Sequence, residues 1–183
     1  MAYAYRDDPI LGPALSYWME KRGGRAMPCK RDIDPTEISG KILPNLQLID
    51  VIDGGARFRY RLIGTATVEA YGEDFTGRYP DEMFSAELRD FIHRVYRQVC
   101  AGRAPVFLSN RYVTKKGFEL ASKRIYMPLC DDSDAVSHIF GVLNFEYESA
   151  IADARWREGA TLVPASAHVE RVDIAPPLSA AAD

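Results

Sequence analysis

Apolar and polar side chains alternate strictly along residues 57–62. A period of two predicts a strand with one buried face and one solvent-exposed face. The preceding run, 46–52, is largely apolar, and Asp53-Gly54-Gly55 between the two runs has the residues of a tight turn. Together they predict a two-stranded hairpin. The apolar positions of the second strand, which we expect to share its buried face, are Phe58, Tyr60 and Leu62.

Helical spacing follows the hairpin. Residues 65–71 form a short amphipathic segment, and Gly72 is expected to stop it in a left-handed conformation. Ser85 is placed to cap a long helix over residues 86–101. The expected buried stripe of this helix, which turns His93 towards solvent, comprises Phe84, Leu88, Phe91, Val95 and Val99.

Three further strands are expected at residues 105–113, 118–129 and 136–147, joined by two polar turns as in an antiparallel meander. Apolar side chains lie on both faces of the last two strands, so both faces of the sheet need a cover. The amphipathic segment 9–22 is the candidate cover for the second face. Its apolar stripe, which we also expect to form a homodimer interface, consists of Leu11, Leu15, Trp18 and Met19.

Several short motifs carry a resemblance to a known fold: RYRLIGT in the second strand, AYGEDFTGR and PDEMF after it, the long helix, and a KKG hairpin. In this order they resemble a PAS domain. The segments WMEKRGG and LPNLQLID are further similar to short stand-alone PAS proteins of alphaproteobacteria, which form their own profile family. The resemblance implies an α+β fold. A five-stranded antiparallel sheet would carry small helices and one long helix on one face, and the N-terminal helix on the other.

The resemblance also implies three segments: an N-terminal helix and linker at 1–25, the PAS domain at 26–148, and a C-terminal helix and partly mobile tail at 149–183. It implies a non-catalytic sensory or interaction module that binds a small molecule and signals through dimerisation. Two alternatives stay open. One is a PAS dimerisation module without a ligand. The other is a small isomerase-like enzyme with a cone-shaped α+β fold, a fold that usually places its helices before most of its sheet.

In the register of other PAS domains, Arg124 points into the pocket between sheet and helices. A guanidinium buried there requires a partner. That partner is either internal, Glu69 or Asp74, or a bound small carboxylate held bidentately with neighbouring hydroxyls. The side chains expected to line the pocket are Tyr60, Leu62, Tyr71, Phe75, Phe91, Val95, Leu108, Tyr112, Leu120, Ser122, Arg124, Tyr126 and Leu143.

The cofactor positions of other PAS sensors are not matched. Flavin-binding members place a reactive cysteine where this chain has Phe75, and a glutamine where it has Leu143. The haem-ligand position falls near Phe91, and His93 is two residues, or about 200° of helix rotation, away. We therefore expect neither cofactor and no metal.

The composition narrows the functional classes further. The net charge of -3 disfavours a nucleic-acid partner. The chain has no apolar run of about 18 residues and no secretory signal, so we expect no membrane partner and a cytoplasmic location. The expected partners are a second copy of the chain, a small-molecule ligand and a regulatory protein.

The reactive side chains show no catalytic or metal-binding pattern. We find no nucleophile–base motif, so we expect no enzymatic activity. Cys29, Cys100 and Cys130 are odd in number and lack a CxxC spacing, which predicts reduced thiols and no zinc site. A basic cluster between the first two segments, Arg25, Lys30 and Arg31, is more typical of a solvated connector than of an anion site.

Overall fold

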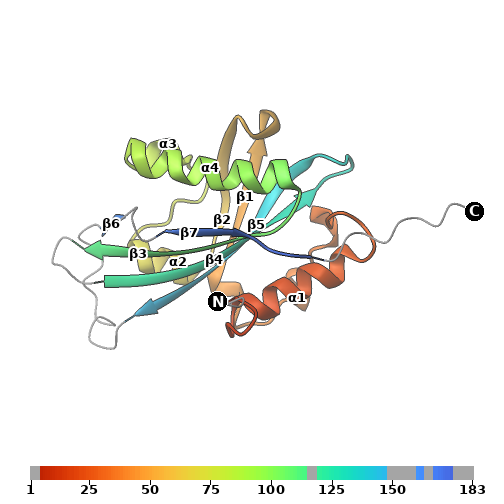
Figure 1. Cartoon of the computed structure of the whole chain (residues 1–183), viewed down its shortest axis with the longest axis horizontal. Helices are drawn as coiled ribbons and strands as arrows, with labels where there is room; N and C mark the ends of the chain where they lie inside the picture. Colours follow the sequence, from red (N-terminus) through yellow and green to blue (C-terminus); the bar gives the residue numbers. More distant parts are fainter. Residues whose placement is uncertain (1–4, 115–118, 148–159, 163–166, 175–183) are drawn as a thin grey trace, which may run out of the picture.

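The computed structural model describes residues 5–114, 119–147, 160–162 and 167–174 (Figure 1). Within these residues, seven strands form one antiparallel sheet in the order β2-β1-β5-β4-β3-β6, and β7 also pairs with β3. The strands are β1 (Leu46–Ile52), β2 (Arg57–Ile63), β3 (Val106–Thr114), β4 (Glu119–Cys130), β5 (Val136–Tyr147), β6 (Ala160–Leu162) and β7 (His168–Arg171). The α-helices are α1 (Leu11–Arg22), α2 (Thr65–Tyr71), α3 (Pro80–Met83) and α4 (Ala86–Gly102).

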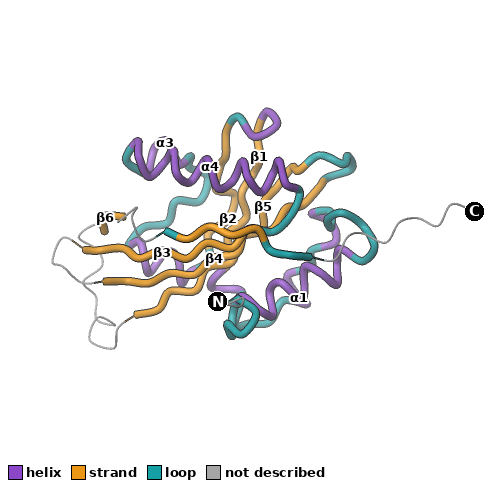
Figure 2. The backbone as a smooth tube through the Cα atoms, viewed as in Figure 1, coloured by secondary structure: helices purple, strands orange, loops and turns teal. Residues whose placement is uncertain are grey.

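We call the face of the sheet that packs against α2, α3 and α4 the inner face, and the face that packs against α1 the outer face. Figure 2 shows α4 and α1 on opposite sides of the strands. In β4, Tyr126 belongs to the inner core, whereas Ile125 and Met127 belong to the outer core. The sequence prediction that both faces of the sheet are covered is confirmed.

Helix α1 is fixed to the outer face by hydrogen bonds as well as by apolar contacts. Trp18 is fully buried, and its indole Nε1 donates to the carbonyl oxygen of Pro128 in β4 at 2.9 Å. At the start of the helix, the carboxylate of Asp8 accepts from the backbone N–H of Leu11 at 3.0 Å. The side-chain amide of Asn144 in β5 donates to the same carboxylate at 3.0 Å. One capping residue therefore anchors α1 to the sheet.

A β-bulge in β2 corrects the prediction for Leu62. In the pairing with β1, Leu48 lies opposite Leu62 but Ile49 lies opposite Tyr60, so Arg61 is an extra residue. An extra residue reverses the alternation of side chains beyond it. Leu62 therefore points away from the core and is 47% exposed, whereas Ile63 is buried.

The predicted stripe of α4 is confirmed at Val95 and Val99, whereas Phe84, Leu88 and Phe91 are only partly buried. The buried positions are Ile92, Val95, Tyr96 and Val99, whose i, i+3, i+4, i+7 spacing defines one helix face. Phe91 is only half-buried, at the edge of the inner core. His93, which we expected in solvent, is 8% exposed. Its ring packs against the ring of Phe58 with centroids 5.5 Å apart.

The C-terminal segment contributes strands that the sequence did not predict. Residues 168–171 form β7 and residues 160–162 form β6, and both pair with β3 at the edge of the sheet. Beyond β7, Val172 is buried in the outer core beside α1. The helix expected at 151–156 lies outside the described residues.

The prediction of reduced cysteines is contradicted for two of the three. Cys29 and Cys130 form a disulfide across 101 residues of sequence, and Cys100 is a free thiol. Their Cα atoms lie 4.2 Å apart because the linker after α1 runs alongside the end of β4. Spacing along the chain could not reveal this pairing.

Candidate ligand site on the inner face

Arg124 is the charged side chain at the centre of the inner face. It lies in the middle of β4, paired with Leu108 of β3 on one side and Leu143 of β5 on the other, and is 4% exposed. Its Nε donates to the hydroxyl of Ser122 at 3.2 Å, and its Nη2 donates to the hydroxyl of Tyr71 at 3.1 Å. Strand β4 and helix α2 therefore both position the guanidinium.

A chain of polar groups continues from Arg124 to the neighbouring strand. Asn110 of β3 lies opposite Ser122, and the Ser122 hydroxyl donates to Asn110 Oδ1 at 2.7 Å. Asn110 is 3% exposed, and its amide Nδ2 has no hydrogen-bond partner among the described residues. A buried N–H group without a partner costs free energy. The site therefore offers an unused donor beside a positive charge.

A second unused polar group lies two strands away. Gln47 of β1 is 3% exposed, and within the described part of the chain its Oε1 accepts no hydrogen bond. Gln47 pairs with Gly141 of β5, which pairs in turn with Tyr126 of β4. A Cβ atom on Gly141 would lie 3.0 Å from two carbons of the Tyr126 ring. Because Gly141 has no side chain, the Tyr126 ring can lie directly against β5.

Aromatic rings form the apolar wall of the site. Phe75 packs edge-on against Tyr60 and Tyr71, with ring centroids 4.7 Å and 5.5 Å away. Tyr96 of α4 packs against Tyr126 at 5.1 Å, and its hydroxyl donates to that of Tyr60 at 3.4 Å. Burial raises the pKa of Tyr96 well above its usual value, so this hydroxyl stays neutral. The site combines apolar walls with a few convergent polar groups, as small-molecule sites do.

A family model described as a PAS domain matches residues 9–144 of the chain. The chain belongs to the PAS domain family. This match decides against the cone-shaped enzyme fold, and it includes α1 in the family's domain. Comparison with curated protein sequences gave no match.

Solved structures include PAS-like neighbours of low identity. The chain is similar to Vibrio cholerae VqmA, solved with a ligand and DNA, with a TM-score of 0.46 and 16% identity over 61% of this chain and 52% of VqmA. It therefore spans about half the length of VqmA. It is also similar to the PAS domain of Bordetella pertussis BvgS, with a TM-score of 0.45 and 23% identity over 58% of this chain and 80% of that one.

Most of the side chains proposed from the sequence as pocket-lining residues of this PAS domain lie on the inner face. Leu62 is excluded by the bulge, and Phe91 lies at the rim. The side chains of Tyr112 and Leu120 lie outside the described residues. The residues that the inner face brings together are Tyr60, Tyr71, Phe75, Val95, Leu108, Ser122, Arg124, Tyr126 and Leu143.

Two carboxylates suggested as internal partners of Arg124 lie on the surface of the PAS domain. Glu69 and Asp74 are exposed, and Asp74 accepts a hydrogen bond from the backbone N–H of Thr76 at 2.9 Å. Gln47, Tyr96 and Gly141 were not among the proposed site residues. The alternation of β1, in which Gln47 shares a face with Ile49, carries a signal for Gln47.

The proposed dimer residues mostly serve the PAS core itself. Leu11, Leu15 and Trp18 are buried in the outer core, so their side chains are not available to a second subunit. Met19 is half-buried. The prediction of an interface made by this stripe is corrected, because the outer core of its own chain buries three of the four side chains.

Other predicted features concern the surface. Two members of the basic cluster have acidic partners: Arg25 binds Asp32 at 2.8 Å, and Arg31 forms an ion pair with Asp132. Among the described residues, His, Cys, Asp and Glu form no group of three or more that could hold a metal. None of the described helices is long and apolar enough to cross a membrane.

Proposed function

We propose that this PAS domain is a non-catalytic sensory module that binds a small carboxylate on its inner face. The observation that carries the proposal is the buried polar group of Arg124, Ser122 and Asn110, placed among aromatic side chains. A guanidinium carries five N–H donors in a fork that fits carboxylates, and in this structure Ser122 and Tyr71 each accept from one of them. The amide Nδ2 of Asn110, which has no partner among the described residues, adds a buried donor to this group.

Gln47 indicates a second group that the ligand should carry. It lies on the same face as Arg124 and two strands away, which corresponds to roughly 10 Å across the sheet. Its Oε1 is a buried acceptor without a described partner, so it fits a hydroxyl or an ammonium group. The site therefore favours an acid with a hydrogen-bond donor at its far end over a plain aliphatic acid.

Strand β4 connects this site to α1. Arg124 and Tyr126 face the site, whereas Ile125 and Met127 face the outer core. The next residue, Pro128, accepts the hydrogen bond from Trp18 of α1. A ligand that shifts the inner side chains of β4 would also shift the surface on which α1 rests. We propose that this is how occupancy reaches the outside of the protein.

The output we propose is a homodimer that uses the solvent side of α1. A groove of ≈ 1160 Å³ runs between α1 and the chain after β7, lined by Ser16, Tyr17, Met19, Asp173 and Ile174 among others. A regulatory protein is the alternative occupant of this surface. A second copy of the chain and a regulatory protein are both compatible with a sensor whose core is already covered by its own helices.

A thermal-shift screen of small carboxylic acids tests the ligand. An acid that binds the folded protein but not the unfolded chain raises the melting temperature. We expect some hydroxy or amino acid to stabilise the wild type and Arg61→Met, whose side chain is 47% exposed on the other face, but not Arg124→Met. An acid that stabilises Arg124→Met equally, or a screen with no effect on the wild type, would contradict the proposal.

A further inference from the structure

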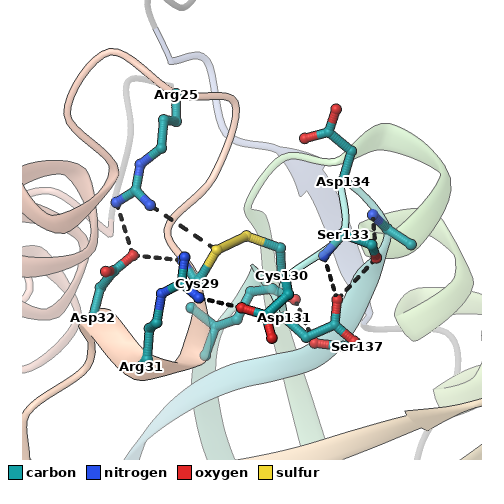
Figure 3. Close-up of a disulfide and its surroundings, with 12 residues drawn as sticks. Arg25, Cys29, Arg31, Asp32, Cys130, Asp131, Ser133, Asp134 and Ser137 are labelled. Atoms are coloured by element: carbon teal, nitrogen blue, oxygen red, sulfur yellow. Dashed lines mark hydrogen bonds and ion pairs between the residues drawn. A yellow bond between two sulfur atoms is a disulfide. The ribbon is translucent and has the colours of Figure 1, made fainter.

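The disulfide links the linker after α1 to the end of β4, and Figure 3 shows charged side chains around it. Three contacts join α1 and the linker after it to alternate residues of β4 and the turn that follows β4. Trp18 binds Pro128, the backbone N–H of Cys130 donates to the Pro28 carbonyl at 3.0 Å, and Arg31 pairs with Asp132. The two cysteines therefore meet because a whole segment is docked, with the disulfide in its centre.

The non-covalent contacts of this docking are weak at its outer end. The side chains of Arg31 and Asp132 are 67% and 88% exposed, so water screens their ion pair. The backbone pairing at Cys130 is an isolated bridge of one residue. The disulfide adds a covalent connection to the packing of Met27 and Cys29 in the outer core.

Charged groups of both signs surround Cys29, and the Asp32 carboxylate accepts a hydrogen bond from its backbone N–H at 2.8 Å. Arg25 Nη1 lies 4.0 Å from Cys29 Sγ, and the same guanidinium is held by Asp32 and by the carbonyl oxygen of Lys21. The Cys29 sulfur therefore lies beside a guanidinium that is itself paired with a carboxylate. The third cysteine, Cys100, is not part of this cluster, and burial raises the pKa of its thiol to about 11.

We propose that Cys29 and Cys130 are a reversible redox switch that locks or releases the linker between α1 and the sheet. The oxidant we assign is a low-molecular-weight disulfide such as oxidised glutathione. The thiolate of Cys29 attacks one sulfur of that disulfide and expels one glutathione thiolate. The thiolate of Cys130 then attacks the Cys29 sulfur and expels the second. Two protein thiols are oxidised, one glutathione disulfide is reduced to two thiols, and the protons pass to the released thiolates.

The switch is independent of the inner-face ligand. It acts on the linker at residues 23–33, which leads from α1 to the sheet. Release of this linker loosens the attachment of α1 that Trp18 makes at Pro128. The redox state would therefore change the same surface through which we propose that the domain signals.

Limited digestion with trypsin measures the release directly, because Arg25 and Arg31 are exposed cleavage sites in the linker. The full chain is equilibrated in glutathione buffers that range from reduced to oxidised, then digested, quenched and reduced before mass spectrometry. We expect cleavage within the linker, residues 23–33, to be at least about 10-fold faster in the reduced protein. Thiol labelling of the native protein in the same buffers should show interconversion without unfolding.

Matched variants separate the switch from a general loss of stability. Cys100→Ser should keep the full redox dependence, and Cys29→Ser or Cys130→Ser should be cleaved rapidly in every buffer. Equal cleavage rates of the oxidised and reduced wild type would overturn the proposal. A disulfide that glutathione reduces only after denaturation would overturn it as well.

Discussion

His93 and His138 show how single side chains couple this fold to pH. Burial lowers the pKa of His93, with the nearby Arg97 and Arg89 acting in the same direction against Asp81. Burial also lowers the pKa of His138, and Lys30 and Arg61 act in the same direction. The carboxylate of Asp50, whose Oδ1 lies 3.4 Å from His138 Nε2, opposes this shift. The folded state therefore prefers both rings neutral.

This preference predicts loss of stability in mild acid. Both folded pKa values lie below the unfolded value of 6.5, so the stabilisation is complete above that pH and is lost as the pH falls through the folded values. Denaturant unfolding at about pH 7.5 and about pH 5.5 should show a lower free energy of unfolding in the acid sample.

Substitutions identify the source of that loss. His93→Phe, which keeps a ring against Phe58, should reduce the pH dependence, whereas His168→Gln, at an exposed position, should leave it unchanged. A wild type equally stable at both pH values would show that neither histidine is held neutral by the fold.

Several individual side chains could be placed from the sequence and others could not. Tyr60, Ser122 and Arg124 reach the inner face because strict alternation fixes their direction. The direction of His93 depended on the rotation of α4, and Phe84 and Leu88 suggested a stripe that is displaced from the buried one. Phe84 before α4 and Phe91 within it are only partly buried against the inner core, so they do not mark its centre.

At the scale of elements, β2 departs most from its own pattern. Its alternation predicts a regular strand, and the bulge at Arg61 becomes visible only in the pairing with β1. The sequence interrupts the alternation only at the apolar pair Leu62-Ile63, which does not by itself identify Arg61 as the extra residue. The hairpin turn, in contrast, followed from Asp53-Gly54-Gly55, which adopts positive φ at all three residues.

The bulge predicts opposite results for two adjacent residues. Leu62→Ala removes an exposed side chain and should change the free energy of unfolding by no more than about 0.5 kcal/mol. Ile63→Ala empties a buried position and should cost roughly 2–4 kcal/mol. Urea unfolding of the two variants measures both. A larger cost for Leu62→Ala than for Ile63→Ala would mean that β2 is regular.

The whole molecule is a sheet covered on both faces, with the candidate site on one face and α1 on the other. The sequence predicted these layers because the apolar residues of β4 and β5 occupy both faces. It did not predict β6 and β7, since short edge strands carry little alternation. The disulfide between Cys29 and Cys130 was missed because contacts across a sequence separation of 101 leave no local pattern.

The proposed dimer is tested on the solvent side of α1. Ser16 is exposed and lines the groove there, whereas Gln98 is exposed on α4. Ser16→Lys places a charge in the interface and should raise the dimer dissociation constant at least about 10-fold, or 1.4 kcal/mol. Gln98→Lys adds the same charge elsewhere and should have no effect. Light scattering that finds only monomers of the wild type at high concentration would rule the dimer out.

The central claim is that Arg124 holds a carboxylate on the inner face. Isothermal titration of the full chain with the best acid from the thermal-shift screen tests it most directly. We expect one site per chain in the wild type and in Arg61→Met. In Arg124→Met we expect at least about 100-fold weaker binding, because a charge-assisted bidentate contact contributes roughly 2–3 kcal/mol. Equal affinity of the wild type and a folded Arg124→Met variant would contradict the account.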